Sequence, residues 1–125
     1  RLKAMVEEGL VDYVAMDVKN APSRYGETAG FPKLELDPIR ESIEFLKSGA
    51  VESEFRTTVV KGIHTEADVI DAAQLVEGAS QYFLQQYVDP GTLGDSGLSA
   101  FSPAEMRRFA ELAKPYVKNI GIRGV

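Results

Sequence analysis

Residues 54–78 read EFRTTVVKGIHTEADVIDAAQLVEG, a strand-like run followed by a helix with clear boundaries. The first seven residues are rich in β-branched and aromatic side chains, which favour strands. Thr65 and Asp68 then form a capping box, with an aspartate in place of the usual glutamate or glutamine, and Gly78 ends the helix. The stretch therefore predicts one strand–loop–helix unit.

The same alternation extends along the chain in both directions. We predict further strands at residues 11–19, 82–88 and 119–124, and further helices at residues 1–8, 37–49 and 102–116. The second of these helices starts at the N-cap Asp37, and the third starts at a capping box of Ser102 and Glu105. Alternation of this kind is typical of parallel strands joined by crossover helices. The strand-to-helix loops at 20–36 and 89–101 are long, which indicates a functional site at the carboxyl ends of the strands.

Composition narrows the possible functions. The chain has 125 residues, of which 44% are hydrophobic, and a formal net charge of −5. An acidic chain without a run of Lys and Arg is poorly suited to nucleic acid, and no apolar run approaches the length of a membrane span. The absence of cysteine excludes thiolate metal ligands within these residues. We expect a single domain over residues 1–125, with no metal site, nucleic-acid partner or membrane partner.

The first predicted strand, VDYVAMDVK, carries two charges near its end. Period-two alternation places Val14, Met16 and Val18 on one face, and Asp17 and Lys19 on the other. Charges on a buried strand are usually paired or bind something polar. Lys19 suits an anionic or carbonyl oxygen, and Asp17 suits a hydroxyl or amine. The alternative is an ion pair between the two side chains.

Two later strands place more polar side chains within the predicted sheet. Arg56 lies in mid-strand, where its guanidinium needs a planar acceptor, either on a ligand or on a carboxylate such as Asp17. Gln85 and Gln86 are consecutive, so one of them must face the interior and contact either a base edge or a neighbouring backbone group. His64, the single histidine, lies just before a helix, which is more typical of a surface or capping residue than of a catalytic one.

These strands together resemble a known family. The Asp-x-Lys strand end, the Arg-Thr-Thr-Val-Val-Lys-Gly strand, the Leu-Gln-Gln-Tyr strand and the closing Ile-Arg-Gly are similar, in order and spacing, to the radical S-adenosylmethionine activases of glycyl radical enzymes. The resemblance covers nearly the whole chain. It is nearest to the branch that activates anaerobic ribonucleoside-triphosphate reductase, and the pyruvate formate-lyase-activating branch is similar too.

The resemblance implies an α/β fold, the C-terminal part of a partial (β/α)6 barrel, with four parallel strands and helices on the outer face. In that family a [4Fe-4S] cluster on a CxxxCxxC loop binds S-adenosylmethionine, and reductive cleavage yields the radical that takes hydrogen from a partner's glycine. The resemblance further implies a cytoplasmic enzyme with an electron donor such as flavodoxin. We expect the cluster-binding segment to precede Arg1, and the chain alone to be inactive, with neither cofactor bound.

The resemblance also suggests roles for five residues. Asp17 and Lys19 match the strand end that contacts the ribose and carboxylate of the cofactor, and Arg56 matches an interior arginine beside the methionyl group. Gln85 and Gln86 lie on the strand that carries a histidine in some relatives. All five are therefore candidates for cofactor binding, and none is expected to be catalytic.

Two other classes of protein stay open on the sequence alone. A different β/α-barrel enzyme, such as an aldolase or isomerase, would use Lys19 as a catalytic amine. Asp17, two residues away, would stabilise the ammonium form and so disfavour a Schiff base. A non-catalytic α/β interaction module would need a finished fold, whereas part of a barrel leaves an unpaired edge strand and an exposed inner face.

Overall fold

The structure is a computed structural model that describes residues 13–22, 25, 28, 36–88 and 98–124. The helix predicted at residues 1–8 and much of both long loops lie outside these residues. The described strands are β1 (Tyr13–Asp17), β2 (Glu52–Val59), β3 (Tyr82–Gln86) and β4 (Ile120–Arg123). The helices in the described ranges include α3 (Asp37–Lys47), α4 (Glu66–Leu75), α5 (Pro103–Ala113) and the short 3-10 helix η2 (Lys114–Tyr116). None of the helices in these ranges has the length and apolar character needed to cross a membrane.

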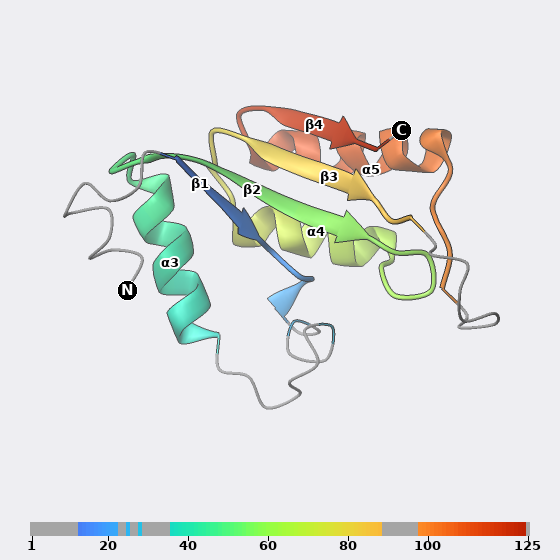
Figure 1. Cartoon of the computed structure of the whole chain (residues 1–125), viewed down its shortest axis with the longest axis horizontal. Coiled ribbons are helices and arrows are strands. Elements are labelled where there is room, and N and C mark those ends of the chain that lie inside the picture. Colours follow the sequence, from blue (N-terminus) through green and yellow to red (C-terminus); the bar gives the residue numbers. More distant parts are fainter. Residues whose placement is uncertain (1–12, 23–24, 26–27, 29–35, 89–97, 125) are drawn as a thin grey trace.

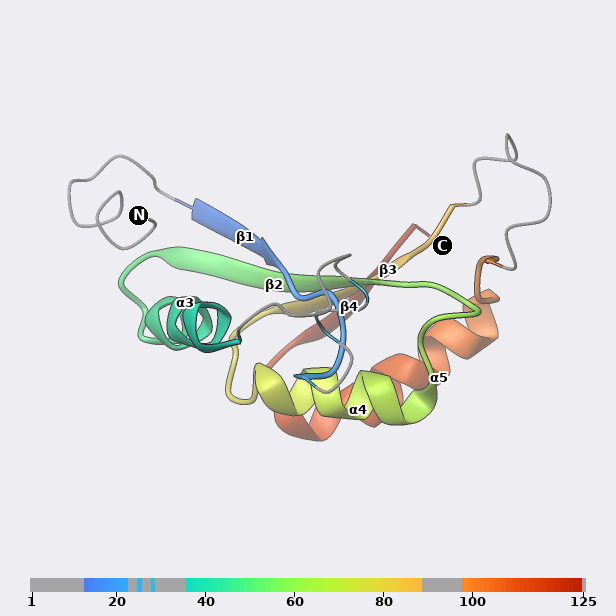
Figure 2. The same ribbon diagram turned by 90° about the horizontal axis from the view of Figure 1, so that it is seen from below.

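The strands form one parallel sheet in the order β1-β2-β3-β4, so each strand pairs with the next one in the sequence (Figure 1). Helices α3, α4 and α5 all lie against the same face of this sheet (Figure 2). Within the described ranges, the other face has no helix over it. The prediction of four parallel strands in sequence order, with helices on one side, is therefore confirmed.

The predicted capping boxes account for two helix starts. Thr65 caps α4 together with Asp68, and Ser102 caps α5 together with Glu105. The sequence predicts Asp37 as the cap of α3, whereas the structure includes Asp37 in the first turn of that helix. A carboxylate in this position is still favourable because it faces the positive end of the helix dipole.

The hydrophobic core lies between the sheet and its helices. The side chains of β2 and β3 that face the helices are buried, with Phe55, Val59, Tyr82 and Leu84 all at most 2% exposed. Thr57 is buried among them, and its hydroxyl lies 2.6 Å from the Tyr82 hydroxyl, so these two polar groups satisfy one another. Burial of this face leaves the charged side chains of the strands on the opposite, open face.

Candidate functional site

Alternation along the strands gathers charged side chains on the open face of the sheet. The residues there include Asp17 from β1, Glu54 and Arg56 from β2, and Arg123 from β4, with Lys19 just beyond the end of β1. They form two groups, one at the carboxyl end of β1 and one that spans the sheet from β1 to β4. The two groups differ in burial and in how many internal partners they have.

The first group, called here the Asp17 group, consists of Asp17, Lys19 and Arg56. Asp17 and Arg56 are direct partners in the register of β1 and β2, and the Nε atom of Arg56 donates to Asp17 Oδ1 at 2.7 Å. The Lys19 Nζ atom lies 3.8 Å from Asp17 Oδ2. The structure thus brings together the three charged residues that the sequence singled out, and it shows the pairing of Arg56 with Asp17 that the sequence allowed.

The Asp17 group remains accessible to a ligand. The side chains of Asp17, Lys19 and Arg56 are 47%, 50% and 38% exposed. One carboxylate between two cations leaves a net positive charge, and the bond from Arg56 uses Nε rather than the two terminal nitrogens. The group can therefore receive an anionic group on its cations and a hydroxyl or amine on its carboxylate.

The two glutamines lie on opposite faces of β3. Gln85 is exposed on the open face, in register with Thr58 of β2 and Arg123 of β4. Gln86 points to the helix side, where its Nε2 atom donates to the carbonyl oxygen of Phe101 at 2.7 Å. The structure therefore gives Gln86 a backbone partner and places it on the opposite face from the Asp17 group, and its assignment to cofactor binding stays a prediction.

The second group, the Glu54 cluster, contains one residue from each strand: Tyr13, Glu54, Phe83 and Arg123. Glu54 is 5% exposed. Arg123 donates two hydrogen bonds to its carboxylate, from Nη1 to Oε2 at 2.6 Å and from Nη2 to Oε1 at 3.1 Å. The Tyr13 hydroxyl donates to Glu54 Oε1 at 2.5 Å. The Arg123 guanidinium lies 3.7 Å from the centre of the Phe83 ring. This cation–π contact with β3 supports the ion pair between Glu54 of β2 and Arg123 of β4.

These contacts shift the ionisation of the cluster. The hydrogen bond from Arg123 lowers the pKa of Glu54 below its ordinary value of 4.5; burial acts in the opposite direction, and the bond from Tyr13 adds to the lowering. The hydrogen bond from Tyr13 to Glu54 also raises the pKa of Tyr13, because the carboxylate holds the phenolic proton. Glu54 is therefore a charged carboxylate near neutral pH, with its charge compensated inside the protein.

The Glu54 cluster was not predicted from the sequence. A signal was present, because Glu54 lies two residues before Arg56 and must share its face. The partner Arg123 lies far away in the sequence, in the closing Ile-Arg-Gly, and only the sheet order brings it across β3.

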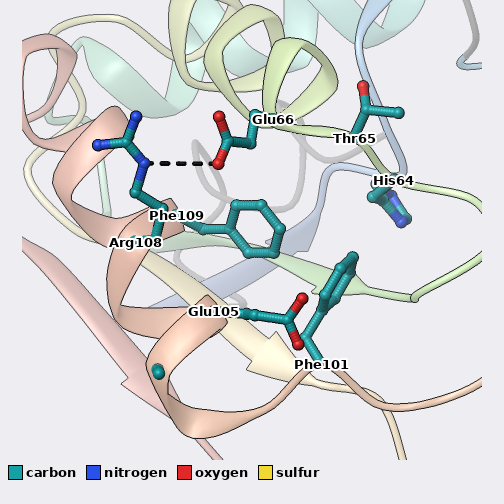
Figure 3. A pocket seen from close by; sticks show the side chains of 8 residues that line it. His64, Thr65, Glu66, Phe101, Glu105, Arg108 and Phe109 are labelled. Carbon is teal, nitrogen blue, oxygen red and sulfur yellow. Dashed lines mark hydrogen bonds and ion pairs between the residues drawn. The ribbon is translucent and has the colours of Figure 1, made fainter.

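A separate pocket of about 340 Å³ lies on the helix-covered side, between the start of α4 and the first turns of α5 (Figure 3). Phe101 and Phe109 meet edge to face in its lining, with ring centres 4.6 Å apart. The ion pair from Arg108 Nε to Glu66 Oε2, at 3.4 Å, crosses the pocket (Figure 3). The pocket does not include the Asp17 group, so the open face remains the candidate site.

Comparisons with known proteins confirm the resemblance predicted from the sequence, which is to the activating enzymes of glycyl radical enzymes. Among curated proteins, the chain is similar to one from Methanocaldococcus jannaschii that is named a glycyl-radical enzyme activating enzyme. The two are 30% identical over 132 residues, which covers 99% of this chain and 54% of the relative. The chain thus spans about half the length of the curated relative it matches.

A solved structure supports the fold. A domain of pyruvate-formate lyase-activating enzyme from Bacteroides vulgatus has a TM-score of 0.71 and 15% identity, covering 98% of this chain and 74% of that chain. At this identity the likeness shows the fold alone, an α/β arrangement consistent with part of a radical S-adenosylmethionine barrel. No protein-family model matches the chain.

Proposed function

We propose that the protein containing this chain is a radical S-adenosylmethionine oxidoreductase that activates a glycyl radical enzyme, and that residues 1–125 form the later part of its barrel. Two findings support the proposal: the likeness to a protein named as such an activating enzyme, and the shared fold. The observation that carries it is the half-exposed Asp17 group at the carboxyl end of β1, where parallel α/β folds bind their ligands.

In this proposal the Asp17 group binds the polar ends of S-adenosylmethionine. The Lys19 ammonium holds the methionyl carboxylate, and Arg56 adds positive charge beside the methionyl group. The Asp17 carboxylate accepts hydrogen bonds from the ribose hydroxyls. Gln85, on the same open face, is the remaining candidate from the sequence, whereas Gln86 is left out because Phe101 already engages its amide.

The donor set of this chain fits S-adenosylmethionine and does not fit the iron–sulfur cluster. [4Fe-4S] clusters are held by cysteine thiolates, and the sequence has no cysteine. The described residues also contain no group of three or more His, Cys, Asp or Glu side chains that could hold a metal ion. We therefore assign the cluster to another part of the protein, and this chain to orienting the cofactor. When bound together, cluster and cofactor supply the one-electron cleavage that produces a hydrogen-abstracting radical.

Lys19→Ala tests the site. In the full-length protein with its cluster assembled, the substitution should weaken S-adenosylmethionine binding by about 1.5–3 kcal/mol, the range for a hydrogen bond to a charged group. Calorimetric titration measures the affinity. The iron content should not change, because Lys19 is not a cluster ligand. Unchanged affinity in this variant would contradict the assignment.

Lys61→Ala is the matched control. Lys61 is 53% exposed and lies 3.5 Å from the Glu105 carboxylate, so it resembles Lys19 in exposure and in having one acidic partner. It follows β2 on the loop that precedes α4, outside the Asp17 group. The control should bind S-adenosylmethionine as the unchanged protein does. An equal loss in both variants would indicate a general effect of positive charge rather than a contact from Lys19.

For the partner, we propose anaerobic ribonucleoside-triphosphate reductase, with an electron donor such as flavodoxin. The support is the similarity of the Arg-Thr-Thr-Val-Val-Lys-Gly and Leu-Gln-Gln-Tyr strands to that branch. The test mixes the reduced full-length protein with S-adenosylmethionine and either this reductase or pyruvate formate-lyase. Electron paramagnetic resonance should detect a glycyl radical on the reductase. A radical on pyruvate formate-lyase alone would retain the activase function and change the partner.

A further inference from the structure

The backbone at the end of β1 is held by side chains from outside that strand. Three consecutive carbonyl groups each accept one hydrogen bond: Asp17 from Tyr25 Oη at 3.3 Å, Val18 from Thr57 Oγ1 at 2.7 Å, and Lys19 from His64 Nε2 at 3.0 Å. The segment that carries Asp17 and Lys19 is therefore held by three side chains.

His64 is part of the buried structure, whereas its position before a helix suggested a surface or capping residue. It is 6% exposed, and its Nδ1 atom accepts a hydrogen bond from the Val60 backbone N–H at 3.0 Å. An accepting Nδ1 carries no proton, so the ring is neutral and the ring proton is on Nε2. Nε2 therefore donates to the Lys19 carbonyl, and one imidazole ring joins the ends of β1 and β2.

The bond to Lys19 matters because Lys19 lies beyond the sheet. β1 ends at Asp17, and the Val18 N–H donates to the Arg56 carbonyl at 2.8 Å just past that end. At the next residue, Lys19, the carbonyl is bound by an imidazole rather than by a neighbouring strand. The direction in which the Lys19 side chain leaves the backbone thus depends on His64.

We propose that His64 is a positioning residue for cofactor binding: it fixes the Lys19 backbone so that the ammonium faces the ligand. This inference rests on the proposed function. His64 does not contact the ligand in this scheme, and it acts only through Lys19.

Two substitutions of His64 test the two hydrogen bonds of its ring separately, because each retains one bond and removes the other. His64→Gln places an amide N–H about as far along the side chain as Nε2, so it retains a donor for the Lys19 carbonyl. His64→Asn places a carbonyl oxygen about as far as Nδ1, so it retains an acceptor for the Val60 N–H but does not reach Lys19. Each variant removes one neutral hydrogen bond, so thermal unfolding should show similar losses of stability.

Cofactor affinity should distinguish them. In the full-length protein with its cluster, calorimetric titration with S-adenosylmethionine should show an affinity about three- to tenfold weaker for His64→Asn, and within about twofold of the unchanged protein for His64→Gln. In a Lys19→Ala background, His64→Asn should cause no further loss. Equal affinities of the two His64 variants, or a loss that persists without Lys19, would overturn the inference.

The failure of this inference can be told apart from the failure of the proposed function. If Lys19→Ala leaves binding unchanged, the proposed site is wrong. If Lys19→Ala weakens binding and His64→Asn does not, only the role of His64 is wrong. If His64→Asn does not fold, nitrogen NMR of the unsubstituted protein decides, with His64→Gln identifying the signals. The expected result is a proton on Nε2 whose resonance moves when S-adenosylmethionine is added; a proton on Nδ1, or an unmoved resonance, would overturn the role.

Discussion

Two carboxylate–arginine pairs occupy the same open face, and they differ in how fully the protein satisfies them. Glu54 receives two bonds from Arg123 and one from Tyr13, and its side chain is 6% exposed. Asp17 receives one bond from Arg56 and is 47% exposed. A buried charge must keep its partners, whereas a half-exposed pair can exchange a protein contact for a ligand contact. The first pair is therefore part of the folded structure, whereas the second is accessible to a ligand.

The largest effect on stability is expected from Arg123→Leu. The substitution leaves the Glu54 carboxylate buried without its cation, which should lower the free energy of unfolding by about 2–4 kcal/mol. The effect should be at the lower part of the range for broken buried pairs because Arg123 itself is 41% exposed. Chemical unfolding followed by circular dichroism measures it.

The control for this prediction replaces both partners. A Glu54→Leu, Arg123→Leu double variant leaves no unpaired charge, so it should be more stable than Arg123→Leu alone. If Arg123→Leu is as stable as the unchanged protein, the distinction between the two pairs fails.

Gly121→Ala should have the next largest effect. A Cβ atom at this position would lie 2.7 Å from Cε1 of the Phe83 ring, whose centre is 3.7 Å from the Arg123 guanidinium. The crowding should cost about 1–3 kcal/mol in the free energy of unfolding. Phe83→Leu should relieve most of this loss. A cost that persists without the ring would show that the stack of Gly121, Phe83 and Arg123 does not support the pair of Glu54 and Arg123.

Acid should have the next largest effect on stability, because it protonates Glu54 in its pair with Arg123. Its pKa is lower in the folded protein than in the unfolded chain, so its contribution to stability is present above its ordinary pKa of 4.5 and is lost as the pH falls through the folded value. The effect should be smaller than that of Arg123→Leu because burial partly offsets the bond from Arg123. Unfolding measured across this acidic range should show a weaker pH dependence for Glu54→Gln; an unchanged dependence would contradict the prediction.

Asp17→Asn should change stability least. Half-exposed ion pairs contribute about 0–1 kcal/mol, so the free energy of unfolding should fall by less than about 1 kcal/mol. In the full-length protein the same variant should bind S-adenosylmethionine more weakly, because the ribose hydroxyls lose a charged acceptor. A loss of stability as large as that of Arg123→Leu would reverse the comparison between the two pairs.

Period-two alternation was sufficient to predict which strand residues share the open face, and capping boxes were sufficient to place the starts of α4 and α5. The partners were not predictable, because they depend on strand register. Asp17 lies opposite Arg56, but a shift of two residues would place it opposite Glu54 without changing any face. Gln85 and Gln86 could not be told apart for a different reason: β3 carries apolar side chains on both faces, so alternation alone did not show which face meets the helices.

The bonds of His64 were not predictable either. Its ring reaches Lys19 because the loop after β2 turns back toward the end of β1. The Ile63 and His64 backbone N–H groups both donate to the Val60 carbonyl, at 3.0 and 2.9 Å, and these bonds define that turn. Such a path depends on the packed loop and not on the pattern of residue types.

The order of the strands also affects how the protein is assembled during synthesis. Each strand pairs with the one made just before it, so each new strand–helix unit can dock as soon as it leaves the ribosome. Asp17 and Arg56 can meet once β2 has been made. Glu54 must wait for Arg123, which is on β4, the last of the four described strands. The growing chain can therefore form the Asp17 group early, and it neutralises the buried Glu54 carboxylate only after β4 has been made.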